Sequence, residues 1–185
     1  YIVRKSVNLS KQIHIIAANI DCAFLLVTLN NPPTYPAFID RFLATAEAYG
    51  IKTALLFNKK DSYSISDSEQ MRSMKKLYEN IGYTCLEISA LKRINLEAVK
   101  TMMEGKTCML SGHSGVGKST LVNALAPELN IKTADISAQH QQGQHTTTFA
   151  EMHDLDFNAR IVDTPGSRGF GVVNMETAEM GDYFR

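Results

Sequence analysis

One nine-residue stretch limits the possible folds more than any other part of the chain. It fits the pattern G-x-x-x-x-G-K-[ST] and consists of Gly112, His113, Ser114, Gly115, Val116, Gly117, Lys118, Ser119 and Thr120. The pattern forms a phosphate-binding loop when a strand precedes it and a helix follows it. Residues 106–111 are mostly apolar and of strand length, and residues 118–126 carry Leu121, Val122 and Leu125 at helical spacing. We therefore expect a strand–loop–helix unit rather than an ordinary glycine-rich turn.

The residue types of this loop suit a nucleoside triphosphate. Glycines allow backbone N–H groups to turn toward an anion, and the N-terminus of the following helix adds partial positive charge. We expect Lys118 to reach the β- and γ-phosphates and to serve catalysis, and the Ser119 hydroxyl to ligate Mg²⁺. The loop indicates a nucleotide but does not indicate which base.

Composition narrows the class of protein only slightly. The chain has 185 residues, which favours one domain with at most small appendages, and its 19 basic and 19 acidic residues balance to zero. Bulk charge therefore points neither to nucleic acid nor to an anionic membrane, and no apolar run reaches the ~20 residues of a membrane span. Cys22, Cys85 and Cys108 have no C-x-x-C spacing, so we expect buried, reduced thiols rather than a metal site or a redox pair.

Apolar runs and amphipathic segments alternate along most of the chain. We expect strands at 23–29, 53–57 and 84–88, and helices at 38–49, 66–81 and 96–103. This alternation predicts an α/β fold with a mainly parallel sheet flanked by helices. Ser66 and Glu69 are in position to form a capping box at the start of the second helix.

The segments before and after this alternating region do not continue its pattern of strands and helices. Residues 1–11 are mixed and basic and suggest an extended lead-in. Residues 137–144 are polar and aperiodic, which is typical of a mobile loop. Residues 147–155 and 159–162 are expected to be strands, paired as a hairpin around 156–158.

A second motif selects the base. Asn58, Lys59 and Asp61 fit N-K-x-D directly after an expected parallel strand, at the edge of the sheet where ligands bind. The Asp61 carboxylate can accept hydrogen bonds from N1–H and the 2-amino group of guanine, which adenine lacks. At ~1.5–3 kcal/mol each, these bonds give roughly 3–6 kcal/mol, or about 10²–10⁴ against ATP. The segment at Ser89 and Ala90 resembles the companion motif, in which a backbone N–H reads the guanine 6-oxygen.

Two further motifs follow the phosphate loop. Asp163 and Gly166 fit D-x-x-G, in which Asp163 would hold a water on Mg²⁺ and the Gly166 N–H would face the γ-phosphate. Between the loop and this motif lies a run of three consecutive threonines at 146–148, and one of them would complete the Mg²⁺ shell only when the γ-phosphate is present. Thr147 is the first choice, with Thr146 and Thr148 as alternatives.

The motifs stand in an unusual order. Ordinary GTPases carry the phosphate loop first and N-K-x-D late, whereas here Asn58 precedes Gly112. This circularly permuted order, the G-x-H-T-T-T segment and the D-T-P-G-S-R-G-F-G segment at 163–171 resemble the RsgA/YjeQ family. Those proteins are GTPases that assist late assembly of the small ribosomal subunit, and the resemblance covers nearly the whole chain.

The resemblance carries several expectations. Residues 1–20 would lead in from an OB-fold domain, residues 21–185 would form the GTPase domain, and a zinc-binding domain would follow, so that zinc is expected only there. The cofactors would be GTP or GDP and Mg²⁺, and the partner the small ribosomal subunit with its rRNA. A cytoplasmic monomer without membrane contact is implied. Within the family, the histidine that matches His145 is a proposed positioner of the attacking water.

Two functions remain open at this point. The first is a GTP hydrolase that acts as a switch in assembly of the small ribosomal subunit. The second is a nucleotide-binding module whose GTP-bound form simply docks a partner. Ser167 stands where ordinary GTPases carry the water-orienting glutamine, which favours the second. A third reading, an ATPase, conflicts with Asn58 and Asp61.

Overall fold

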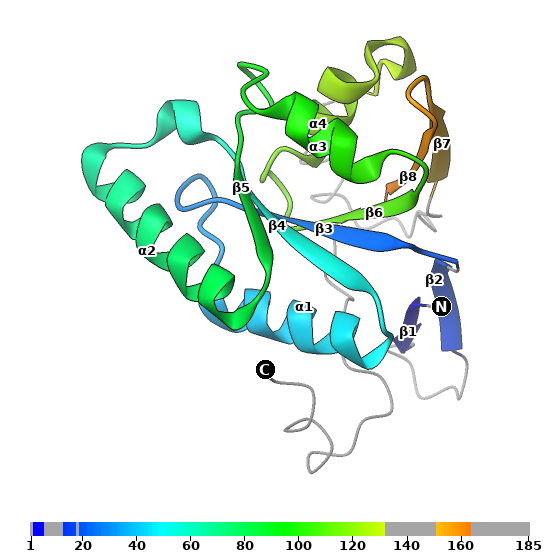
Figure 1. Cartoon of the computed structure of the whole chain (residues 1–185), viewed down its shortest axis with the longest axis horizontal. Helices are drawn as coiled ribbons and strands as arrows, with labels where there is room; N and C mark the ends of the chain where they lie inside the picture. The colour runs from blue at the N-terminus through cyan, green and yellow to red at the C-terminus, as the bar shows by residue number, and fades with distance from the viewer. Residues whose placement is uncertain (1, 6–12, 18, 132–150, 164–185) are drawn as a thin grey trace, which may run out of the picture.

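The computed structural model describes residues 2–5, 13–17, 19–131 and 151–163 (Figure 1). The elements in chain order are β1 Ile2–Lys5, β2 Ile13–Ala17, β3 Cys22–Val27, α1 Pro36–Ala48, β4 Lys52–Phe57, the 3₁₀ turn η1 Lys60–Ser62, α2 Ile65–Ile81, β5 Thr84–Glu87, α3 Leu96–Met103, β6 Thr107–Ser111, α4 Lys118–Leu125, η2 Pro127–Leu129, β7 Glu151–Leu155 and β8 Ala159–Asp163. Each expected strand and helix within the described residues is present, with ends shifted by a few residues.

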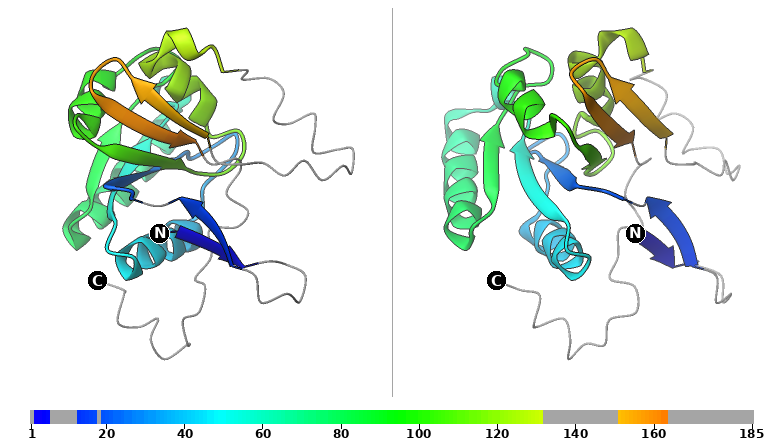
Figure 2. Two further views of the ribbon diagram at one scale, coloured as in Figure 1. Left: turned by 90° about the vertical axis from the view of Figure 1, so that its right-hand side faces the viewer. Right: turned by 45° about the vertical axis from the view of Figure 1, so that its right-hand side comes forward.

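A six-stranded sheet forms the centre of the fold, with strand order β5-β4-β3-β6-β8-β7. All its neighbours pair in parallel except β7 and β8, which form the expected antiparallel hairpin at one edge (Figure 2). The prediction of an α/β fold with a mainly parallel sheet is confirmed. Among the described residues, no helix combines the length and apolar character needed to cross a membrane.

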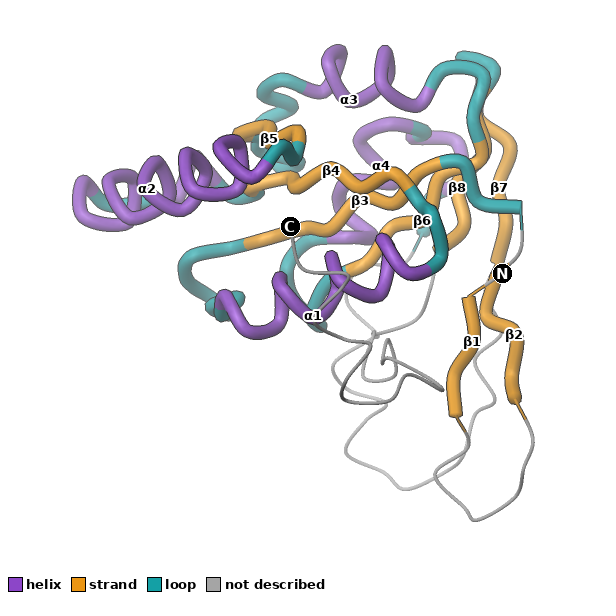
Figure 3. The backbone as a smooth tube through the Cα atoms, turned by 60° about the horizontal axis from the view of Figure 1, so that its bottom comes forward, coloured by secondary structure: helices purple, strands orange, loops and turns teal. Residues whose placement is uncertain are grey.

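Helices cover both faces of the sheet (Figure 3). Alternate residues of the central strand β3 enter different cores: Phe24 and Leu26 pack with α3 and α4, while Leu25 and Val27 pack with α1 and α2. Because both faces of β3 are buried, its sequence is a continuous apolar run instead of an alternating one.

The strand order reverses between β3 and β6. The chain moves from β3 outward through β4 to β5, and then returns to β6 on the other side of β3. In open α/β sheets this reversal opens a crevice at the carboxyl ends of the two strands, where ligands bind. The loop at residues 112–117 follows β6 and therefore lies at this crevice.

The cap of α2 differs from the sequence prediction. The N-cap is Ser64, which forms a capping box with Asp67, and not Ser66 with Glu69. Both pairs have the required spacing, so the sequence alone does not decide between them. Asp67 also accepts a hydrogen bond from the Asn30 side chain at 3.0 Å, and this tertiary contact favours the earlier start.

The start of the chain is more than an extended lead-in, because β1 and β2 pair as an antiparallel hairpin. The three cysteines are free thiols, as expected, and Cys85 and Cys108 are buried whereas Cys22 is partly exposed. Cys22 and Cys108, although far apart in sequence, face each other across β3 and β6. The loop expected at 137–144 and the first part of the strand expected at 147–155 lie outside the described residues.

Candidate nucleotide-binding site

The loop between β6 and α4 has the backbone expected of a phosphate-binding loop. Gly117, with φ of 99°, immediately precedes α4, which begins at Lys118. Lys118 and Ser119 are only 8% and 7% exposed. The Lys118 ammonium group donates to the carbonyl oxygens of Gly112 and His113 at 2.8 and 2.9 Å. The loop is thus closed around its own lysine, which holds the ammonium group at the N-terminus of α4.

Two glycines are required by close contacts as well as by their dihedral angles. A Cβ on Gly112 would lie 2.9 Å from the Leu26 carbonyl oxygen at the end of β3. A Cβ on Gly117 would lie 2.5 Å from the side-chain nitrogen of Asn58. The loop therefore approaches the ends of β3 and β4 so closely that no side chain fits at either position.

Asn58 joins the three segments that the sequence assigned to the nucleotide. It is 2% exposed at the end of β4. Its side-chain nitrogen donates to the Val116 carbonyl oxygen at 2.8 Å, and its side-chain oxygen accepts from the Ala90 N–H at 2.9 Å. One buried amide therefore connects N-K-x-D, the phosphate loop and the Ser89–Ala90 segment, which are widely separated in sequence.

Lys59 makes a second connection to the phosphate loop. It adopts a left-handed conformation with φ of 65°. Its ammonium group donates to the Gly115 carbonyl oxygen at 2.8 Å and also to that of Asn31 in the loop after β3. Burial lowers the pKa of Lys59, and the nearby Asp61 carboxylate partly opposes this shift. The side chain therefore fastens three loops at the carboxyl edge of the sheet.

Asp61 lies at this edge, where a base-reading carboxylate is expected. It is exposed, and one of its carboxylate oxygens accepts a hydrogen bond from the Ser89 hydroxyl. The same hydroxyl accepts from the Lys92 N–H at 2.9 Å. Ser89 thereby fixes the orientation of Asp61 and leaves its other oxygen available for a ligand.

Three supporting residues were missed in the sequence. The Tyr63 hydroxyl donates to the Asn58 carbonyl oxygen and accepts from the Leu29 N–H at 3.2 Å, and its pKa is raised to about 12, chiefly by burial. The Phe38 ring of α1 packs on the His113 ring with centroids 3.8 Å apart. The Asn31 carbonyl oxygen, in the loop after β3, accepts a hydrogen bond from Lys59. None of these residues belongs to a motif, so spacing gave no signal.

The side chain of His113 packs against α1. Its ring faces α1, and its pKa is lowered by burial and secondarily by the charge of Lys118. The His113 ring is therefore turned toward α1, and the expectation for an anion at the loop concerns the backbone of His113, together with those of Ser114, Val116 and Thr120.

The remaining predicted site residues are only partly placed. The backbone of Asp163 ends β8 and pairs with Leu110 of β6, two residues before Gly112. This register brings the backbone of Asp163 to the same edge of the sheet as the phosphate loop. His145, Thr147 and Gly166, and the alternatives Thr146 and Thr148, lie outside the described residues.

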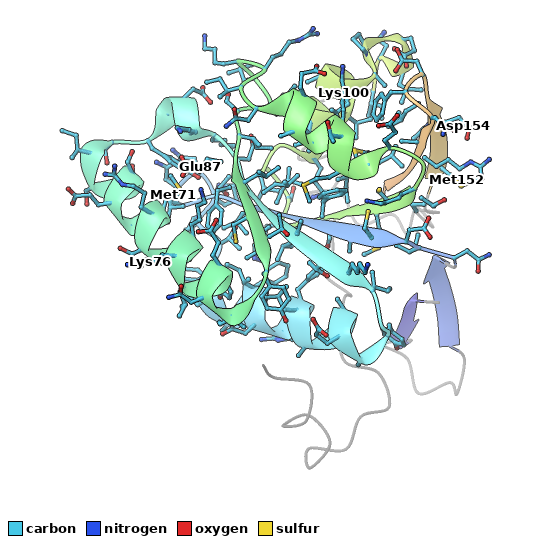
Figure 4. The ribbon with its side chains drawn as sticks, in the orientation of Figure 1. Met71, Lys76, Glu87, Lys100, Met152 and Asp154 are labelled. Atoms are coloured by element: carbon cyan, nitrogen blue, oxygen red, sulfur yellow. The ribbon has the colours of Figure 1, made fainter. Side chains whose placement is uncertain are left out.

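Glu87, which Figure 4 labels, ends β5 and supports the turn that carries Asp61. Its carboxylate pairs with Lys60 at 2.7 Å and with Lys75 of α2 at 3.1 Å. Its carbonyl oxygen accepts from the Asn95 side chain at 2.7 Å. The hydrogen bond from Lys60 lowers the pKa of Glu87, and Lys75 adds to the shift. Glu87 therefore holds the residue before Asp61 against the strand that leads to Ser89.

Replacing Glu87 by glutamine is expected to weaken the site modestly. Exposed ion pairs contribute about 0.2–1 kcal/mol each, so we expect a loss of about 1 kcal/mol in the free energy of unfolding and about fivefold faster GDP release. Urea unfolding and the release of a fluorescent GDP measure both. The matched control is Glu97→Gln, which removes an ion pair with Lys100 from a carboxylate that is 87% exposed.

The contribution of Glu87 also has a definite pH dependence. Because the folded state lowers its pKa below the ordinary value of 4.5, the stabilisation is fully present above that value. It is lost as the pH falls through the lower, folded-state pKa. The difference in stability between the parent and Glu87→Gln should therefore shrink on acidification. A difference that persists unchanged at pH 3 would assign the effect to packing instead of charge.

The residues present fit a guanine nucleotide. A glycine-rich loop begins a helix at the switch point of a parallel sheet, and an N-K-x-D strand end lies beside it with its carboxylate oriented by a serine. Together they define a P-loop nucleotide-binding protein whose GTPase motifs stand in circularly permuted order.

Comparison with known sequences identifies the family. The chain belongs to the RsgA GTPase family, whose profile matches residues 1–173. It is 64% identical to a protein of Christiangramia forsetii and 61% identical to one of Flavobacterium johnsoniae, both named small ribosomal subunit biogenesis GTPase RsgA. In each case the match covers 100% of this chain and 58% or 57% of the relative. The chain thus spans a little over half the length of these relatives.

Solved structures agree with this assignment. YjeQ from Thermotoga maritima is 33% identical, with a TM-score of 0.77 over 95% of this chain and 57% of that protein. YloQ, described as a circularly permuted GTPase, is 26% identical, with a TM-score of 0.69 over 100% of this chain and 62% of that protein. The expected resemblance to the RsgA/YjeQ family is confirmed.

Proposed function

We propose that this chain binds GTP and hydrolyses it to GDP and phosphate, as a switch in late maturation of the small ribosomal subunit. The observation that carries the nucleotide part is the Asn58 amide, which joins the base-reading and phosphate-binding segments through buried hydrogen bonds. The ribosomal part rests on the family and on the names of the relatives. Small-subunit rRNA is the proposed partner, and the cytoplasm, where the subunit is assembled, the proposed location.

The test is multiple-turnover phosphate release by the full-length protein, with and without small ribosomal subunits. We expect release from GTP and not from ATP, and a strong increase with the subunits. Equal release from both nucleotides would contradict the base assignment. Tight GTP binding with no turnover in either condition would instead support the second candidate, a GTP-dependent docking module, which the serine at position 167 favours.

Mg²⁺ is the proposed metal. Among the described residues there is no ready cluster of three or more acidic, cysteine or histidine ligands. A Mg²⁺ ion at a phosphate loop, however, takes few protein ligands and several waters. We propose that Ser119 and Thr147 ligate it and that Asp163 holds one of its waters. The metal would supply charge neutralisation at the β- and γ-phosphates. Lys118 would add its charge there, and the Gly166 N–H would face the γ-phosphate.

Replacing Ser119 by alanine is expected to uncouple nucleotide binding from Mg²⁺. The affinity for GTP in Mg²⁺ should fall by about tenfold or more, which corresponds to roughly 1.4 kcal/mol, and approach the value measured in EDTA. Isothermal titration in both buffers measures the change. Ser73→Ala, on α2, removes a hydroxyl far from the loop and should leave both values unchanged. Parent-like Mg²⁺ dependence of Ser119→Ala would remove this residue from the metal site.

His145 is the proposed positioner of the attacking water. Since no glutamine follows Gly166, we expect slow turnover without the ribosomal subunit, on the order of 10⁻³ s⁻¹ or less. Imidazole can orient water or relay a proton near neutral pH. His145→Ala in the full-length protein should abolish the subunit-stimulated rate and leave GTP affinity unaltered, whereas His140→Ala should retain both. If the stimulated rate survives His145→Ala, another group positions the water.

The domain organisation is also a proposal. By family resemblance, residues 1–20 would continue an OB-fold domain, residues 21–185 would be the GTPase domain, and a zinc-binding domain would follow. The greater length of the relatives is consistent with further domains. Zinc analysis of the full-length protein, alongside the 185-residue chain, tests this organisation. Sedimentation of the full-length protein tests the proposed monomer.

A further inference from the structure

Two cysteines lie side by side on the two middle strands of the sheet. Cys22 begins β3 and Cys108 lies near the start of β6, and the parallel register pairs them directly. Their sulfur atoms are 2.7 Å apart. Adjacent strands are separated by about 4.8 Å, which falls within the Cα separation that a disulfide requires. The backbone therefore already satisfies the main geometric condition for a bond between them.

The surroundings hold this geometry in place. The Asp21 N–H donates to the Thr107 carbonyl oxygen at 2.9 Å, and the Thr107 N–H donates to the Asp21 carboxylate at 2.7 Å. These two hydrogen bonds clamp the chain immediately before each cysteine. The sulfur atoms therefore need to approach each other by only a fraction of an ångström to form a bond.

The two thiols differ in accessibility. Cys22 is partly exposed, whereas Cys108 is fully buried with 0% exposure. Contact with Cys108 lowers the pKa of Cys22, and the charge of Lys106 acts in the same direction. The same contact, together with burial, raises the pKa of Cys108. A reagent from solution therefore meets Cys22 first, and Cys22 forms the thiolate more readily.

We propose that Cys22 and Cys108 form a reversible disulfide, with Cys22 as the attacking thiol and Cys108 as the resolving thiol. The co-reactant is a small-molecule disulfide of the glutathione class. The Cys22 thiolate attacks one sulfur of the reagent, forms a mixed disulfide and releases one small thiolate. The Cys108 sulfur then attacks the Cys22 sulfur, and its proton passes to the second small thiolate as that group leaves. The protein pair is oxidised by two electrons, and one reagent disulfide is reduced to two thiols.

The position of the bond determines its consequence. Both cysteines lie at the amino ends of their strands, whereas the phosphate loop follows the carboxyl end of β6. The bond would connect residues 86 apart in sequence and restrict the unfolded chain. We therefore expect oxidation to raise Tm by about 5–10 °C and to leave the dissociation constant for GDP unchanged.

The test uses the full-length protein, reduced and then equilibrated with excess oxidised glutathione. Alkylation and peptide mapping by mass spectrometry follow Cys22, Cys85 and Cys108. We expect a Cys22–Cys108 disulfide that dithiothreitol reverses. Cys85 should stay a free thiol that is alkylated only after denaturation, because burial raises the pKa of the Cys85 thiol to about 12. Cys108→Ser should accumulate glutathione on Cys22, whereas Cys22→Ser should leave Cys108 free.

The matched control is Cys85→Ala, which should form the same disulfide in the same yield. Free thiols at both positions after equilibration would overturn the proposal. A stable glutathione adduct on Cys22 in the parent protein would overturn it as well, because it would show that Cys108 does not resolve the intermediate. Neither outcome bears on nucleotide hydrolysis, which the disulfide does not require.

Discussion

Replacing Asp61 by asparagine is expected to lower the affinity for GTP by about 10²–10⁴ and to raise that for xanthosine triphosphate. The exposed carboxylate accepts from Ser89 on one oxygen, which leaves the other free to meet the base. With guanine, a carboxylate accepts from N1–H and from the 2-amino group. An amide instead presents an N–H to the base, which opposes the 2-amino group of guanine but complements the 2-oxygen of xanthine.

Competition binding with the two nucleotides measures this exchange of preference. The matched control is Asp67→Asn, which changes a nearby aspartate to the same amide. Asp67 serves the capping box of α2 and the contact with Asn30, so its replacement should cost stability without altering the choice of base. An Asp61→Asn protein that still prefers GTP by the parent margin would show that Asp61 does not read the base.

The sequence was sufficient to predict those parts of the fold and the site that are determined by neighbouring residues. The phosphate loop, its strand and its helix follow from one contiguous pattern of glycines, a lysine and apolar residues. The parallel strands were identifiable because burial on both faces leaves a continuous apolar run, as in Cys22–Val27. The permuted order could also be read directly, since motif order is a property of the sequence.

Contacts between residues on different strands could not be predicted from local sequence patterns. Asn58 follows β4 and Val116 follows β6, and the sheet places these two strands on either side of β3. The hydrogen bond between the two residues depends on this strand order, which no single segment of the sequence reveals. The Cys22–Cys108 pair depends on the register of two strands, which spacing along the chain does not reveal. The choice of Ser64 over Ser66 as the cap depended on a side chain from another loop. In each case the deciding partner is distant in sequence.

The permuted order leaves the site intact because its parts are held by lateral contacts rather than by chain connectivity. The ends of β3, β4 and β6 and the segment after β5 are joined by side chains of Asn58, Lys59 and Ser89. These contacts depend on strand order in the sheet, and the order is independent of where the chain starts. A change that separates these loops should therefore damage the site even though it removes no contact to the ligand.

Replacing Gly117 by alanine provides that change. The new Cβ would lie 2.5 Å from the Asn58 side-chain nitrogen, so Asn58 must move and lose its bonds to Val116 and Ala90. Two buried hydrogen bonds and a strained left-handed alanine amount to about 3–5 kcal/mol, and we expect GDP affinity to fall by about 10²–10³. Titration calorimetry measures the loss, and urea unfolding shows how much of it reflects the fold.

The matched control for Gly117→Ala is Gly105→Ala. Gly105 also has positive φ, at 71°, but a Cβ there would meet nothing within 4 Å, and the residue lies at the opposite end of β6 from the phosphate loop. It should therefore show the conformational cost of about 1–2 kcal/mol alone, with nucleotide affinity retained. If Gly117→Ala bound GDP as tightly as Gly105→Ala, the Asn58 amide would not be what holds the base-reading loop to the phosphate loop.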